Sequence, residues 1–158
     1  MHIGEEECSF TSEGAIVTKL RYVSCCEHNG IVYMMGTWNH HVINYNPELK
    51  TSEMTNYVIE TNLQNSGICC SPKGEIYVFR QDHFRKCYEG EITVISDMPM
   101  SGSWWGPVIS QWYRGSIYIL RNDETLYRVD EVTGEFTNME YPEIADSVKV
   151  PSYEYDSS

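Results

Sequence analysis

The sequence predicts an all-β protein in which a unit of four short antiparallel strands occurs three times. Three observations lead to this prediction: a repeated glycine–tyrosine motif, clusters of turn residues between short apolar runs, and the lack of a helical pattern. Apolar side chains nowhere follow the 3.6-residue period of an amphipathic helix over about ten residues or more. At 158 residues the chain is long enough to bury a core without disulfide support.

A glycine followed three residues later by a tyrosine marks each unit. The motif occurs as Asn29–Tyr33, Lys73–Tyr77 and Arg114–Tyr118, and its tyrosines are 44 and 41 residues apart. The cysteine doublets Cys25–Cys26 and Cys69–Cys70 lie five and four residues before the glycine of their own units. Doublets and tyrosines in phase indicate a true internal repeat.

Each unit divides into four strands separated by turn residues. The first strand precedes the motif glycine, which permits the positive φ of a tight hairpin. The second strand follows at once and is rich in Ile, Val, Tyr and Phe, which favour a pleated sheet. The predicted strands are 22–26, 31–35, 41–45 and 53–58; 67–71, 75–80, 84–88 and 91–96; and 107–113, 116–121, 125–130 and 135–139, with further strand-like segments at 14–20 and 147–150.

Four antiparallel strands repeated about every 42 residues are typical of a β-propeller blade. The chain resembles kelch repeats, in which a glycine, an aliphatic pair and a tyrosine open the second strand and a third-strand tyrosine precedes a turn. Matching segments are Gly74–Val78, Tyr45–Pro47, Met98–Pro99, Gly115–Ile119 and Tyr127–Asp130. The double glycine and the fourth-strand tryptophan of typical kelch blades are missing. The resemblance covers roughly residues 20–142 and implies three antiparallel propeller blades.

Three blades do not close a ring, because a propeller needs at least about 4 blades around its axis. An open arc would leave two apolar faces in water. We therefore expect a partial, or half, β-propeller that is completed in one of three ways. Two copies form a six-bladed homodimer, another or longer chain supplies the missing blades, or the terminal segments fold back as caps.

The net charge of −12 is concentrated at the two ends of the chain. Residues 1–14 carry four acids and no base, and residues 122–158 carry ten acids and two bases. The expected organisation is an acidic N-terminal segment at 1–14, three blades at about 15–60, 61–100 and 101–142, and an acidic C-terminal tail at 143–158.

The acidic charge argues against nucleic acid as a partner, because phosphates would be repelled. The longest apolar runs are far shorter than the ~20 residues that span a bilayer. The N-terminus is acidic, whereas a secretory signal begins with basic residues. We therefore expect no membrane partner and a cytoplasmic location.

The six cysteines lack CxxC spacing. Neighbouring residues of a strand point to opposite faces of the sheet, so neither doublet forms an easy disulfide or a shared metal corner. Free thiols in a reducing compartment are the simplest expectation.

The candidate binding residues are aromatic or lie beside an aromatic side chain. Two adjacent tryptophans lie in the glycine-rich link Ser101–Pro107 between the second and third units. Exposed tryptophan is enriched in interface hot spots, although one of this pair could instead pack between blades. The candidates are Trp38, His40, Trp104, Trp105 and Trp112.

The sequence contains none of the motifs GxSxG, HExxH or GxxxxGK[ST]. His40–His41 has no carboxylate at ligand spacing, and adjacent strand residues face opposite ways. We therefore expect no enzyme, no cofactor and no metal. The kelch resemblance implies a scaffold that binds a partner protein through inter-blade loops. A carbohydrate-binding module with exposed aromatic loops, or an enzyme on a completed propeller, are the alternatives.

Overall fold

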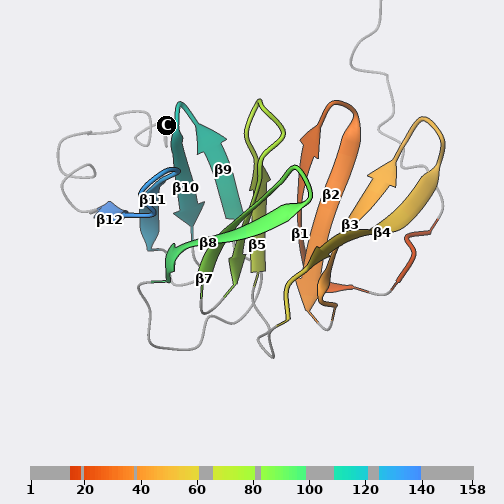
Figure 1. Ribbon diagram of the computed structural model, residues 1–158, viewed down its shortest axis with the longest axis horizontal. Helices are drawn as coiled ribbons and strands as arrows, with labels where there is room; N and C mark the ends of the chain where they lie inside the picture. The colour runs from red at the N-terminus through yellow and green to blue at the C-terminus, as the bar shows by residue number, and fades with distance from the viewer. Residues whose placement is uncertain are drawn as a thin grey trace, which may run out of the picture.

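The computed structural model describes residues 15–18, 20–37, 39–60, 66–80, 83–98, 109–120 and 125–139. Within these ranges the chain forms twelve strands and no helix (Figure 1). This part of the chain accordingly contains no helix long and apolar enough to cross a bilayer.

The strands form three four-stranded antiparallel sheets, each built from strands consecutive in the chain. The first sheet contains β1 (Arg21–His28), β2 (Ile31–Thr37), β3 (His41–Asn46) and β4 (Thr51–Val58). The second contains β5 (Ser66–Cys70), β6 (Ile76–Arg80), β7 (His83–Tyr88) and β8 (Glu91–Asp97). The third contains β9 (Ile109–Tyr113), β10 (Ser116–Leu120), β11 (Leu126–Asp130) and β12 (Phe136–Met139). The all-β prediction of three four-stranded blades is confirmed.

The motif glycines take positive φ, as predicted, but the turns differ in length. In Asn29–Gly30 and Arg114–Gly115 both residues have positive φ, the geometry of a two-residue hairpin. The turn of the second sheet is longer: Gly74 N donates to Ser71 O at 3.0 Å and Ser71 N donates to Glu75 O at 2.9 Å. This extra length changes which residues face the neighbouring sheet.

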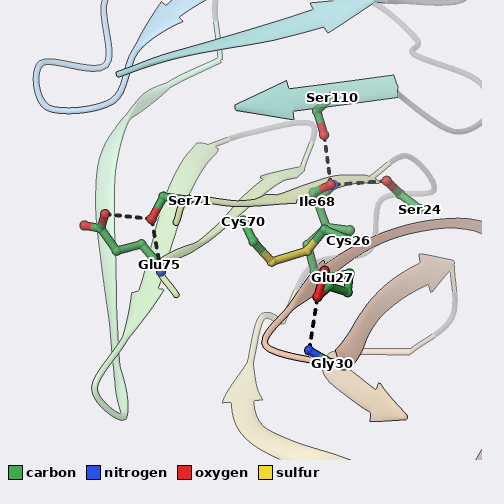
Figure 2. The surroundings of a disulfide bond; sticks show 9 residues. All are labelled: Ser24, Cys26, Glu27, Gly30, Ile68, Cys70, Ser71, Glu75 and Ser110. Atoms are coloured by element: carbon green, nitrogen blue, oxygen red, sulfur yellow. Dashed lines mark hydrogen bonds between the residues drawn. A yellow bond between two sulfur atoms is a disulfide. The ribbon is translucent and has the colours of Figure 1, made fainter. Parts of the chain in front are cut away.

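The second sheet lies between the other two, and the buried side chains form two clusters. The first strands β1, β5 and β9 lie side by side (Figure 1). Ile68 N donates to Ser24 Oγ at 3.1 Å, and Ser110 Oγ donates to Ile68 O at 3.0 Å (Figure 2). The first cluster contains Met35, Val42, Ile59, Ile68, Ile76, Val78 and Cys87; the second contains Cys69, Tyr77, Phe79, Phe84, Met98, Ile117, Ile119 and Val129.

A disulfide joins Cys26 of β1 to Cys70 of β5, whose Cα atoms are 6.0 Å apart (Figure 2). The expectation that the cysteines are all free thiols is therefore wrong. Adjacent cysteines do not pair with each other, as expected, but Cys26 finds its partner on the next sheet. Cys25, Cys69 and Cys87 are free.

The longer turn in the second sheet explains this pairing. Cys26 lies opposite Tyr33, and Cys69 lies opposite Tyr77. Cys26 is thus the structural equivalent of Cys69, although spacing to the glycine aligns it with Cys70. The offset turns Cys70 toward the first sheet, where it meets Cys26.

Arg80, at the end of β6, is 1% exposed and reaches into the first sheet. Its guanidinium donates to Ile59 O at 3.1 Å, Gly36 O at 3.2 Å and Asn39 O at 3.4 Å. A buried cation held by three carbonyl oxygens fastens the second sheet to the first, because removing it would leave those acceptors without their donor.

The strand predicted at 14–20 is wrong over its described residues, 15–18 and 20, which form no strand. Val17 N donates to the side-chain hydroxyl of Ser52 at 3.1 Å, so here the segment contacts a side chain where a strand would pair with backbone. The strand predicted at 147–150 lies outside the described residues, as do the terminal segments 1–14 and 143–158.

Replacing Gly134 with alanine is expected to destabilise the protein by about 3 kcal/mol, through overpacking and an unfavourable backbone conformation. Gly134 has φ +71°, and an added Cβ would lie 2.5 Å from Ser96 Oγ and 2.8 Å from Ile95 Cγ2. Gly134 O also accepts a hydrogen bond from Ser96 Oγ at 2.9 Å. Urea unfolding of both proteins measures the difference.

Gly90→Ala is the matched control, because Gly90 lies in the corresponding turn of the second sheet. It has φ +83° and no atom within 4 Å of the Cβ position. The control therefore carries only the backbone penalty of about 1 kcal/mol. Equal losses in the two variants would contradict the close packing of β8 against the third sheet.

Candidate functional site

A groove runs between the second and third sheets, where β7 and β8 face the turn that joins β11 to β12. Its larger part is a cavity of about 370 Å³. A smaller cavity of about 240 Å³ adjoins it and shares Lys86 and Thr93. We call the two together the interblade groove. Its lining residues are Lys73, Glu75, Tyr77, Lys86, Thr93, Val94, Ile95, Glu131 and Val132, followed by Tyr88, Glu89 and Glu91.

One wall of the groove is a row of side chains across the second sheet. Tyr77 of β6 lies opposite Lys86 of β7, which lies opposite Thr93 of β8. Residues that are cross-strand partners project from the same face, so all three point toward the third sheet. The row carries an aromatic hydroxyl, an ammonium group and an aliphatic hydroxyl.

The turn after β11 holds the opposite wall. Asp130 Oδ1 accepts hydrogen bonds from Thr133 N at 2.7 Å and Val132 N at 2.8 Å, as in an Asx turn. Both hydrogen bonds lower the pKa of Asp130, and the bond from Thr133 has the larger effect. Glu131 N donates to Gly115 O at 3.3 Å. The turn therefore fixes the backbone from which Glu131 enters the groove.

The carboxylate of Glu131 is oriented by two donors. Trp112 Nε1 donates to Glu131 Oε2 at 2.7 Å, and Tyr77 OH donates to the same oxygen at 3.3 Å. Burial raises the pKa of Tyr77 above its ordinary value, and the nearby charges of Glu131 and Glu75 raise it further. Tyr77 therefore remains a neutral donor at physiological pH.

Glu75 lies on the same side of the groove as Lys86. Ser71 Oγ donates to Glu75 Oε1 at 2.9 Å (Figure 2), and Lys86 Nζ lies 3.7 Å from Glu75 Oε2. Lys73, in the β5–β6 turn, has no ion pair within the described part of the chain. The groove thus presents carboxylates and ammonium groups close together, suited to a ligand that carries charged and hydrogen-bonding groups.

Two buried thiols of the second sheet, which lie outside the groove lining, are poor nucleophiles. Burial raises the pKa of Cys69 to about 12, a shift reduced by the hydrogen bond with Ser110. Burial likewise raises the pKa of Cys87 to about 12, partly opposed by Arg85. Because the thiolate is the reactive form, both groups are inert near neutral pH. Over the residues that the structure describes, no three His, Cys, Asp or Glu side chains form a metal-binding group.

Cys69 and Cys87 are expected to resist iodoacetamide at pH 9 while the protein is folded. With pKa values of about 12, only about one thiol in a thousand is ionised at that pH. Peptide mass spectrometry after a timed pulse, with and without urea, measures the labelling. Rapid labelling of either residue without urea would contradict this.

The structure places two of the five predicted binding residues. His40 is exposed. Its backbone carbonyl oxygen accepts a hydrogen bond from Ile59 N at 2.6 Å. His40 belongs to the first repeat, whereas the interblade groove lies between the second and third sheets. Trp112 is half-buried and reaches Glu131. Trp38, Trp104 and Trp105 lie outside the described residues, so their role remains a prediction.

Sequence reasoning missed the charged residues of the groove. Glu75, Lys86 and Glu131 come from a turn, a strand and another turn in two different repeats. For Glu131 the sequence predicted only a turn, and a turn by itself indicates no binding role. Their convergence follows from how the second and third sheets pack.

No family model matches this chain, and no curated protein matches it. The kelch resemblance therefore remains a prediction. Solved structures do resemble the fold. An auxiliary nutrient binding protein from Bacteroides ovatus ATCC 8483 matches 73% of this chain with a TM-score of 0.56 and 17% identity.

The extracellular domain of a putative hybrid two component system from B. thetaiotaomicron matches 83% of the chain with a TM-score of 0.52 and 15% identity. The matches cover 35% of the nutrient binding protein and 18% of the extracellular domain. At these identities the likeness concerns the fold alone.

Proposed function

We propose that this chain is a non-catalytic binding module of the propeller type, and that the interblade groove binds a segment of a partner protein. The observation that carries the proposal is the fixed carboxylate of Glu131 facing the lysine-bearing wall of the second sheet. Two donors hold one oxygen of this carboxylate, and no described residue hydrogen-bonds the other, Oε1. A preoriented acceptor loses little conformational entropy on binding.

The extent and charges of the groove support a peptide ligand. The two cavities share Lys86 of β7 and Thr93 of β8, and together their linings reach from Tyr77 of β6 to Tyr88 of β7. Glutamates and lysines on its walls can pair with both charges of a polypeptide, and tyrosine offers an apolar contact.

Peptide-array binding with purified protein tests this function. Glu131→Gln is expected to lower the affinity for the bound peptides at least tenfold, because it removes the charge that Trp112 and Tyr77 orient. Glu135→Gln is the matched control: this exposed residue lies in the same loop but outside the groove. Absence of any bound peptide, or equal binding by both variants, would overturn the proposal.

A carbohydrate ligand is the second candidate. A cavity of about 370 Å³ is within the size range of small-molecule sites, and one protein of similar fold is described as nutrient binding. A glycan array probed with the wild type and Glu131→Gln separates the two candidates. Glycan binding that is lost in the variant would move the ligand class from peptide to sugar.

The inter-blade loops remain a second proposed surface for a protein partner. A Trp104→Ala, Trp105→Ala double variant that stays folded and still pulls down every partner protein of the wild type would count against that loop.

The disulfide bears on where the protein resides. The Cys26–Cys70 disulfide favours an oxidising compartment over the expected cytoplasm, because cytosolic proteins rarely keep structural disulfides.

A further inference from the structure

The first and third sheets each have a face turned away from the second sheet. Ser24 and Cys26 contact the second sheet, so the intervening Cys25 lies on the opposite face of the first sheet, where it is exposed. Ser110 and Trp112 contact the second sheet in the same way, which places Gln111 on the far face of the third sheet.

The two observed interfaces repeat one set of forward positions, those facing the next sheet. The first sheet offers Cys26, Tyr33, Met35 and Val42. At equivalent positions, counted from the motif tyrosine, the second sheet offers Cys69, Tyr77, Phe79 and Phe84, each at most 3% exposed. The third sheet has Gln111, Tyr118, Leu120 and Leu126 at these positions, of which only Gln111 is polar and none is fully buried.

The backward positions, which face the previous sheet, repeat as well. The second sheet offers Ile68, Ile76, Val78 and Cys87, and the third offers Ser110, Ile117, Ile119 and Val129. The first sheet has Cys25, Val32, Met34 and Tyr45 at the equivalent places, none of them fully buried. Its far face is therefore built like the surfaces that are covered in the other two sheets.

We propose that a second copy of this chain covers both faces, so that two chains close a six-bladed ring about a two-fold axis. The forward face of the third sheet packs on the backward face of the partner's first sheet, and the reciprocal contact closes the ring. One chain carries both halves of an interface that it already forms twice, so a second copy offers a matching surface to each of the two faces. Residues 15–18 contact the outer strand at Ser52, and Cys25 is exposed.

The equivalence names the pair of residues that meet across the new contact. The natural disulfide joins a forward position, Cys26, to a backward position, Cys70. The corresponding residues are Gln111, opposite Tyr118, and Glu27, opposite Val32. Gln111→Cys combined with Glu27→Cys is therefore expected to form two disulfides between copies, in a background with Cys8→Ser and Cys25→Ser.

Two measurements test the closed ring. Light scattering on the wild-type chain is expected to give twice the chain mass of 18.3 kDa. On non-reducing gels, most of the double-cysteine protein is expected at twice the mass, and reductant should return it to one chain. The control pairs Gln111→Cys with Glu48→Cys, an exposed turn residue of the first sheet, and should stay largely single.

A wild-type mass of one chain across the accessible concentrations overturns the proposal, whether or not the variants fold. A ladder of larger species from the double-cysteine protein also overturns it, because that result indicates an open polymer. Equal cross-linking in the control would show that the linkage is not specific to the predicted pair, and would likewise count against the ring. None of these results depends on peptide binding in the interblade groove.

Discussion

Replacing Arg80 with methionine is expected to lower the free energy of unfolding by about 3 kcal/mol, because buried carbonyl groups lose a charged donor. Methionine fills much of the same volume, so the loss reports the hydrogen bonds more than a cavity. The affected acceptors are the carbonyl oxygens of Gly36, Asn39 and Ile59, which all belong to buried residues. Urea unfolding followed by tryptophan fluorescence measures the change.

Arg128→Met serves as the matched control, because Arg128 is exposed on β11 of the third sheet. It should change stability by less than about 0.5 kcal/mol. Arg80→Lys keeps the charge but has no planar fork of donors, so an intermediate loss is expected. If Arg80→Met were as stable as the wild type, the guanidinium would not hold the first two sheets together.

Removing the disulfide with Cys26→Ala and Cys70→Ala is expected to cost about 4 kcal/mol. The bond joins residues 44 positions apart in the sequence. In the chain-entropy account, closing a longer loop removes more conformational entropy from the unfolded chain. For a chain of this length the loss corresponds to a fall in melting temperature on the order of 10 °C. Calorimetry or thermal circular dichroism measures it.

Reductant provides an internal control for this variant. The wild type should lose a similar amount of stability in excess dithiothreitol, whereas the double variant should not respond. A wild type whose unfolding is unchanged by reductant, together with a fully stable double variant, would show that Cys26 and Cys70 carry no structural bond.

The strand pattern was predictable because its signals are local. Positive φ at Gly30, Gly74 and Gly115 follows from turn chemistry, and alternating apolar side chains define the flanking strands. All twelve strands begin and end within about two residues of their predicted limits. Residues 15–18 show the limit of such signals, since an apolar run forms a strand only where a neighbour offers backbone partners.

The contacts between sheets were not predictable in the same way. One extra residue in the β5–β6 turn decides that Cys70 faces Cys26, and no composition rule reports that offset. Arg80 would ordinarily be assigned to the surface, because isolated arginine is seldom fully buried. Trp112 was identified through its aromatic character, but its partner Glu131 became apparent only when β9 and the β11–β12 turn were placed together in the third sheet.

The site of the disulfide makes the two sheet-to-sheet junctions unequal. The first and second sheets share a covalent bond at their innermost strands, whereas the described part of the third sheet is attached by packing and hydrogen bonds alone. Partial opening therefore favours detachment of the third sheet, with the other two remaining as one cooperative unit. The disulfide thus determines the order in which the sheets unfold as well as the free energy of unfolding.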